Sequence, residues 1–176
     1  MIKGLMKRFF LLVLCLILFG GEAMAFRIES KAFQPKEKIP TQYTCDGEDL
    51  SPPLSWNDPP QGTKSFALIS DDPDAPVGTW VHWVVYHIPA DVRELTEGLP
   101  KTDTLENGSV QGMTDFRRVG YGGPCPPPGK PHRYFFKLFA LDTALSLPAK
   151  AKKADLLSAM NGHILAQAEL IGLYQR

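Results

Sequence analysis

The sequence lacks the residue patterns that mark several large classes of enzymes and nucleic-acid-binding proteins. Its 176 residues include only three cysteines and four histidines, and its 19 basic residues balance 19 acidic ones. A nucleic-acid-binding protein is expected to show a basic stripe, so this balance predicts no nucleic-acid partner. The chain contains no P-loop and no H-E-x-x-H zinc motif. The stretch GSVQG around Ser109 has the wrong spacing for the G-x-S-x-G nucleophile elbow.

The first 25 residues differ in composition from the rest of the chain. Three basic residues precede an apolar run at Phe9–Phe19, and small residues follow in the A-x-A pattern at Ala23–Ala25. This order is typical of a cleavable secretory signal, so we expect residues 1–25 to be removed and 26–176 to form a single domain. Two alternatives are an uncleaved membrane anchor, for which the apolar run is short, and a lipoprotein modified at Cys15.

The expected mature chain would be a periplasmic or secreted protein. Removing residues 1–25 leaves 16 basic and 18 acidic residues, and no other segment is apolar and long enough to span a membrane. Cys45 and Cys125 remain in it. An oxidising compartment would permit a disulfide between them, although two buried thiols are an equally acceptable interpretation.

The regular elements expected after residue 25 are mostly strands. Residue alternation predicts a strand at 63–71, with Phe66 and Leu68 on one face and Ala67 and Ile69 on the other. Segments rich in β-branched and aromatic residues predict long strands at 80–88 and 133–141, and shorter strands are expected near 26–33 and 50–56. The tail at 149–174 is rich in Ala, Leu, Lys, Gln and Glu at helical spacing, and Asn161-Gly162 interrupts it, which predicts two short helices. The fold class is therefore α+β, mainly β, with antiparallel pairing.

Polar residues cluster at the ends of the apolar strands in three segments. The first, DDPDAP at 71–76, offers the carboxylates of Asp72 and Asp74 on a loop stiffened by two prolines. In the second, strand alternation puts His82 on one face with Trp80, Val84 and Tyr86. A strand-ending turn and a buried structural histidine are the plainer interpretations of these two segments.

The third segment runs from Gly120 to Tyr134 and combines glycines, prolines, His132 and Tyr134. His132 and Tyr134 are two residues apart in the following strand, so both side chains lie on one face. Together with nearby glycine amides, they predict a cradle for phosphate or carboxylate. A free polyproline ligand is the alternative for the proline run at 126–128.

These motifs, in this order, resemble the phosphatidylethanolamine-binding protein family. The quoted motifs are DDPDAP, the tryptophan-x-histidine strand and the glycine-proline loop followed by PHRY. YTCDGEDLSPPLSW at 43–56 and GHILAQAELIGLY at 162–174 resemble its bacterial, Raf-kinase-inhibitor-like branch. The resemblance covers the chain from about Phe33 to the C-terminus. It departs from many eukaryotic members at Val81, where they have a second histidine.

The resemblance implies a Greek-key antiparallel β-sandwich with C-terminal helices and a small anion-binding pocket. It also implies a cis peptide at Ala75–Pro76 and a possible homodimer. Carried over by motif, the implied ligand-binding residues are Asp72, Asp74, His82, Gly123, Pro124, His132 and Tyr134.

The function expected from residues and resemblance together is binding of a phosphate-like or phosphorylated ligand, with no enzyme activity and no cofactor. Protonated histidines would donate to the anion, and Asp72 would orient one of them. Affinity should then fall as pH rises through the histidine range. Two alternatives remain open: inhibition of a protease or host factor, and a hydrolase that uses the His, Asp and Tyr side chains. A zinc site built from His82, His132 and Asp72 has weaker support, because the ligands lack local spacing.

Overall fold

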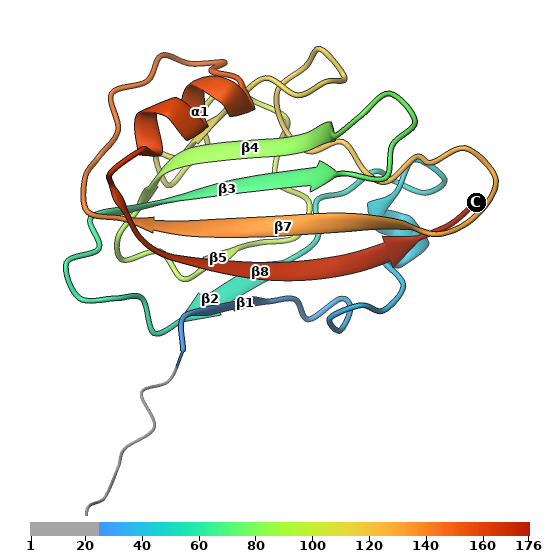
Figure 1. Cartoon of the computed structure of the whole chain (residues 1–176), viewed down its shortest axis with the longest axis horizontal. Helices are drawn as coiled ribbons and strands as arrows, with labels where there is room; N and C mark the ends of the chain where they lie inside the picture. The colour runs from blue at the N-terminus through green and yellow to red at the C-terminus, as the bar shows by residue number, and fades with distance from the viewer. Residues whose placement is uncertain (1–24) are drawn as a thin grey trace, which may run out of the picture.

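The computed structural model describes residues 25–176 and consists of two antiparallel sheets and one helix (Figure 1). The predicted signal segment, apart from Ala25, lies outside the described residues. In chain order the elements are β1 Arg27–Glu29, the 3₁₀ turn η1 Thr41–Tyr43, β2 Leu54–Asn57, β3 Ser65–Asp72, β4 Trp80–Pro89, β5 Glu94–Leu95, β6 Val110–Gln111, β7 His132–Leu141, α1 Lys153–Met160 and β8 Ile164–Tyr174. The α+β, mainly β class and the antiparallel pairing are confirmed, whereas the Greek-key topology stays a prediction.

The larger sheet has the strand order β6-β4-β3-β7-β8, and its centre is the fully buried strand β3. Phe66 and Leu68 belong to one apolar core, and Ala67 and Ile69 belong to a second. The sequence predicted this division from the alternation of side chains along a strand. Because β3 is covered on both sides, its residues 66–69 form a continuous apolar run.

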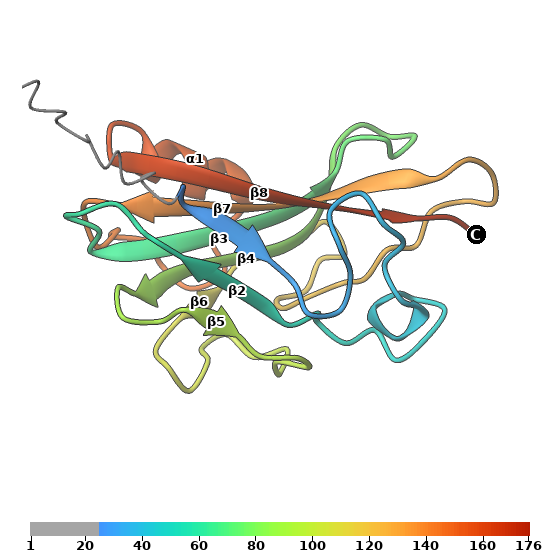
Figure 2. The same ribbon diagram turned by 90° about the horizontal axis from the view of Figure 1, so that it is seen from below.

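Different elements cover the two faces of this sheet. The smaller sheet, ordered β1-β2-β5, lies on one face, and α1 lies on the other (Figure 2). Leu156 and Met160 of α1 pack into the helix-side core, while Ile28 and Trp56 pack into the core between the sheets. None of the helices formed by residues 25–176 is both long and apolar enough to cross a membrane.

The C-terminal prediction of two short helices was half wrong. The first helix exists as α1, but Ile164–Tyr174 forms β8, which pairs with β7 along its whole length. Its buried positions alternate: Ala168, Leu170, Gly172 and Tyr174 are buried, and the residues between them, Glu169, Ile171 and Leu173, are more exposed. Ala, Leu, Gln and Glu favour helices only weakly, and pairing with the exposed edge of β7 overrides that preference.

A bulge in β4 separates His82 from Val84 and Tyr86, two of the three residues predicted to share its face, whereas Trp80 lines the same cavity as His82. Ser70 pairs with Trp83 but the next residue, Asp71, pairs with Val81, so β4 contains one extra residue at His82. Such a bulge reverses the alternation that follows it. Val84 and Tyr86 therefore pack in the helix-side core, while the His82 ring lies against Tyr134 of the core between the sheets.

Candidate ligand-binding site

A cavity of about 280 Å³ lies where β3 ends, β4 begins and β7 begins. In Figure 1 this is the side of the sheet nearest the C-terminus, since His132 pairs with Tyr174 at the end of β8. The fold thus brings together the ends of three segments that the sequence singled out. The lining residues are Asp72, Ala75, Pro76, Val77, Trp80, His82, Phe116, Cys125, Pro126, Pro127, His132 and Tyr134.

His132 and Asp72 form a buried pair in the wall of the cavity. The His132 Nδ1–H donates to Asp72 Oδ2 across 2.8 Å, and the two side chains are 7% and 4% exposed. The second carboxylate oxygen, Oδ1, accepts the backbone N–H of Asp74 at 2.8 Å. With both oxygens occupied, the carboxylate fixes the orientation of the imidazole and leaves its Nε2 available to a ligand.

His82 is also oriented through its Nδ1 atom. This N–H donates to the carbonyl oxygen of Gly122 at 2.6 Å, and the ring packs edge-on against Phe116 and Tyr134. Burial lowers the pKa of His82 below 6.5, although the carbonyls of Gly122 and Gly123 and the charge of Asp72 oppose part of that effect. The neutral ring is therefore favoured, in contrast to the expectation of a charged donor.

Tyr134 supplies a hydroxyl that has no partner among residues 25–176. The side chain is 1% exposed, and its Oη is a buried atom without a hydrogen bond. Burial and the nearby Asp72 carboxylate raise the pKa of Tyr134, so the hydroxyl keeps its proton. A buried unpaired hydroxyl costs roughly 1–3 kcal/mol, so this atom indicates a place for a ligand or water.

The glycine-proline loop builds the wall of the cavity but does not offer the predicted amides. The N–H of Gly122 donates to the His82 carbonyl at 2.9 Å, and the N–H of Gly123 donates to Asp49 Oδ1 at 2.6 Å. Pro124 accepts the N–H of Cys45 at 3.1 Å. Gly123 and Pro124 therefore hold the wall without lining the cavity, and the expected cradle of glycine amides is wrong because those amides are already bonded.

A disulfide between Cys45 and Cys125 joins this wall to the loop after η1. The two Cα atoms lie 5.4 Å apart although the residues are 80 positions apart in the chain. Of the two interpretations left open by the sequence, the structure has the disulfide. Cys125 itself lines the cavity, so the crosslink fixes the wall at the point where a ligand would touch it.

Asp74 does not line the cavity, and its role in ligand binding stays a prediction. Its carboxylate forms an ion pair with Arg133 at 2.8 Å on the protein surface. The hydrogen bond from Arg133 lowers the pKa of Asp74 to about 2. The Ala75–Pro76 bond is trans rather than cis, and the turn is instead closed by the Gly78 N–H donating to the Ala75 carbonyl.

Two residues important to the cavity were missed from sequence. Phe116 forms part of the rim and packs edge-on against Trp80 with ring centroids 5.6 Å apart. Asp49 connects three loops, accepting from Lys101 at 2.5 Å, from Arg118 at 2.9 Å and from the Gly123 N–H. Asp49 belongs to the motif YTCDGEDLSPPLSW, so the sequence did contain a signal that could have identified it. Phe116 belongs to none of the motifs, so the sequence contained no such signal for it.

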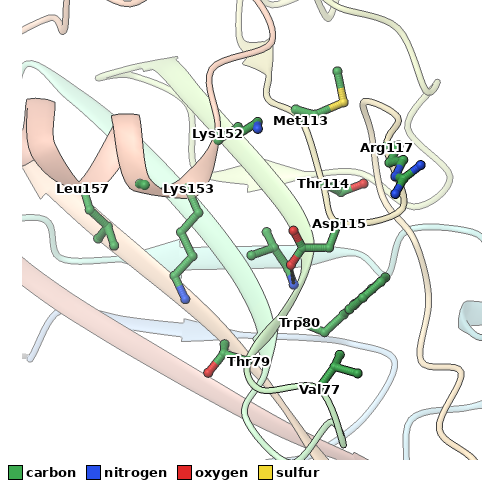
Figure 3. A pocket seen from close by; sticks show the side chains of 12 residues that line it. Val77, Thr79, Trp80, Met113, Thr114, Asp115, Arg117, Lys152, Lys153 and Leu157 are labelled. Carbon is green, nitrogen blue, oxygen red and sulfur yellow. Dashed lines mark hydrogen bonds between the residues drawn. The ribbon is translucent and has the colours of Figure 1, made fainter.

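A larger groove of about 950 Å³ adjoins the cavity and shares Val77 and Trp80 with it. Figure 3 shows Lys152 and Lys153 on one side of the groove, at the start of α1, and Asp115 and Arg117 on the other. Its polar groups reach solvent or are already paired, as Asp115 is with the Val81 N–H. The smaller cavity, with its buried and unpaired hydroxyl, is the stronger candidate.

Residues 25–176 contain no group of three His, Cys, Asp or Glu side chains placed to hold a metal ion. His82, His132 and Asp72 therefore do not form such a group.

The fold and the cavity together describe a β-sandwich binding protein with a histidine-lined pocket, and comparison with known proteins gives its family. A family model described as "Phosphatidylethanolamine-binding protein" matches residues 29–175, and the chain belongs to this family. The chain is 55% identical over 161 residues to a UPF0098 protein of Aquifex aeolicus, covering 90% of this chain and 94% of the relative. A UPF0098 protein of Methanothermobacter thermautotrophicus is 54% identical over 149 residues, covering 85% and 98%.

Two solved structures share the fold. The phosphatidylethanolamine-binding protein homologue CT736 of Chlamydia trachomatis is 42% identical with a TM-score of 0.79. The YbcL protein of E. coli, described as a member of the mammalian PEBP family, is 38% identical with a TM-score of 0.79. Each comparison covers 86% of this chain and 98% of the other, so the fold matches over nearly the whole described region.

Proposed function

We propose that the cavity binds a small oxyanion, either phosphate itself or the phosphate group of a larger compound. The observation that carries this proposal is the buried Tyr134 hydroxyl, which has no hydrogen-bond partner among residues 25–176. His82 and His132 stand beside it with their Nε2 atoms uncommitted. An oxyanion can accept a hydrogen bond from the Tyr134 hydroxyl and from the Nε2–H of a protonated imidazole.

Binding is favoured over catalysis by the kinds of residue in the lining. Among the residues that line the cavity there is no serine, no threonine and no free thiol, since Cys125 is in the disulfide. The His132–Asp72 pair resembles the base and orienting acid of a hydrolase, but such a pair acts on a nucleophile. We therefore propose a binding protein without enzyme activity, and inhibition of a protein partner remains an alternative hypothesis.

The test is a calorimetric titration of the purified protein with phosphate, phosphoethanolamine and acetate. We expect the two phosphorylated compounds to bind and His132→Ala to abolish their binding. The matched control is His163→Ala, because His163 also pairs with an aspartate, Asp142, at 2.8 Å but lies exposed and far from the cavity. Failure of the wild-type protein to bind either phosphorylated compound would contradict the proposal.

We also propose that the protein is exported and works in the periplasm or outside the cell. The charged, apolar and A-x-A order of residues 1–25 supports this, and the Cys45–Cys125 disulfide fits an oxidising compartment. Expression of the full chain in a bacterial host should give a periplasmic product whose mass corresponds to a start at Phe26. Recovery of the full-length chain from the cytosol would contradict export.

A further inference from the structure

The hydrogen bonds of His82 fix which of its ring nitrogens carries a proton. Its Nδ1 faces the Gly122 carbonyl oxygen at 2.6 Å, and a carbonyl can only accept, so Nδ1 must carry the hydrogen. In the neutral ring, Nε2 then presents a lone pair to the cavity. Burial of this side chain, which is 3% exposed, lowers its pKa and favours this neutral form.

Tyr134 presents the opposite polarity next to that lone pair. Its ring lies edge-on to the His82 ring with centroids 5.1 Å apart, and its buried hydroxyl retains its proton. The cavity therefore offers a fixed acceptor, the His82 Nε2, beside a hydroxyl that can donate. His132 adds an Nε2 that accepts in the neutral ring and donates in the charged one, since its Nδ1 is bonded to Asp72 in both.

The charges around these groups limit how negative a ligand can be. Lining residues of the cavity include neither lysine nor arginine, whereas the Asp72 carboxylate is part of the wall. Asp71 and Asp74 add negative charge beyond it, although each is paired, with lysines and with Arg133 respectively. Tyr174, opposite His132 on β8, donates its hydroxyl to Asp46.

We propose that the cavity selects an oxyanion that carries one acidic proton, namely hydrogen phosphate or a phosphomonoester, over sulfate and over phosphodiesters. This inference rests on the proposed function of the same cavity. The P–O–H group of such a ligand donates to His82 Nε2, and a charged P–O⁻ oxygen accepts from the Tyr134 hydroxyl. Sulfate and a phosphodiester carry no proton near neutral pH, so they leave the His82 lone pair facing an oxygen lone pair, an arrangement that binding sites reject strongly.

The first experiment is a set of calorimetric titrations at pH 6 with inorganic phosphate, methyl phosphate, dimethyl phosphate and sulfate. Near this pH about half of a phosphomonoester still holds its second proton. We expect inorganic phosphate and methyl phosphate to bind at least about tenfold more tightly than dimethyl phosphate and sulfate. This ratio corresponds to the cost of leaving one buried polar group without a hydrogen-bond partner. Sulfate or dimethyl phosphate binding as tightly as methyl phosphate would overturn the inference and leave the proposed function standing. Absence of binding by all four compounds would overturn both.

The role of His82 is tested by His82→Gln, whose amide can either donate or accept. We expect this variant to bind sulfate and methyl phosphate with similar affinity, while Tyr134→Phe weakens both by a similar factor and keeps their ratio. The control His163→Gln should keep both the affinities and the ratio of the wild-type protein. An unchanged ratio in folded His82→Gln would contradict the role of His82.

A second measurement does not depend on the variants folding. Proton–nitrogen correlation spectra of the histidine rings in the wild-type protein report the tautomer and charge of each imidazole. We expect His82 to be neutral with its proton on Nδ1 at pH 7, both free and with inorganic phosphate bound. A charged ring, or a proton on Nε2, would overturn the inference.

Discussion

Asp71 and Asp72 are neighbours at the end of β3, both almost fully buried, yet they serve opposite faces of the sheet. Asp71 faces α1 and binds two ammonium groups, from Lys137 at 2.8 Å and from Lys153 at 2.5 Å. Asp72 faces the cavity and binds one imidazole, whose far nitrogen is left for a ligand. The helix-side carboxylate is saturated by the protein itself, whereas the cavity-side carboxylate orients a group that can still bind something else. The same residue type thus stabilises the fold at one position and prepares a site at the next.

The largest effect should come from the helix side. Replacing both lysines, K137M/K153M, leaves the buried Asp71 carboxyl without a cation. We expect the free energy of unfolding to fall by about 3–5 kcal/mol in urea denaturation. The control K150M breaks the exposed Lys150–Asp103 pair and should change stability by less than about 0.5 kcal/mol. If K137M/K153M and K150M reduced the free energy of unfolding equally, the two lysines would not be needed to stabilise the buried Asp71 carboxylate. The proposed contrast between Asp71 and Asp72 would then be wrong.

The next effect concerns the wall of the cavity. C45S/C125S removes the crosslink between segments that are 80 residues apart. We expect a loss of roughly 2–4 kcal/mol in the free energy of unfolding and weaker binding of inorganic phosphate, because the wall containing Cys125 becomes free to move. Denaturation and calorimetry of the same samples check this. Phosphate affinity equal to that of the wild-type protein would mean that the hydrogen bonds accepted by Asp49 are enough to hold the wall.

The pH dependence of the free energy of unfolding tests the cavity side of the sheet, through His82. The pKa of His82 is lowered in the folded protein, so the unfolded chain binds a proton more readily. Stability from this group is therefore complete above about pH 6.5 and declines as the pH falls below it. We expect the decline between pH 7 and 5, measured by urea denaturation without phosphate, to be smaller in His82→Phe. His163→Phe should retain the wild-type slope.

The smallest effect should come from the surface pair beside the cavity. The pKa of Asp74 is lowered to about 2 by Arg133, so its stabilisation is present above its unfolded pKa near 3.8 and is lost as pH falls through about 2. Arg133→Ala should reduce stability slightly at pH 5, because surface pairs are screened by water, and the difference should shrink toward pH 2. Thermal unfolding at both pH values checks this. A difference that grows on acidification would contradict the assignment.

Sequence patterns predicted the central strands well because β4 and β7 are dense in β-branched and aromatic residues, and because β3 carries apolar residues on both of its faces. They failed for β8, because Ala, Leu, Gln and Glu suit a helix as readily as an edge strand, and only the pairing with β7 decides between them. Strand alternation placed His132 and Tyr134 together on one side of the cavity. Strand alternation could not predict the hydrogen bond of the Gly123 amide, because its acceptor Asp49 lies 74 residues earlier in the chain.

The extra residue in β4 has a consequence for how this site can be inherited or lost. His82 is the extra residue between Val81 and Trp83, which pair with adjacent residues of β3. The direction of its side chain is therefore set by the number of residues in this part of β4 and not by the identity of its neighbours. Deleting a single residue there would return an otherwise unchanged histidine to regular alternation and carry it away from Tyr134. Relatives that keep the histidine but differ by one residue in this strand would therefore keep the motif without the chemistry, so strand length is as informative as the histidine itself when the site is traced across the family.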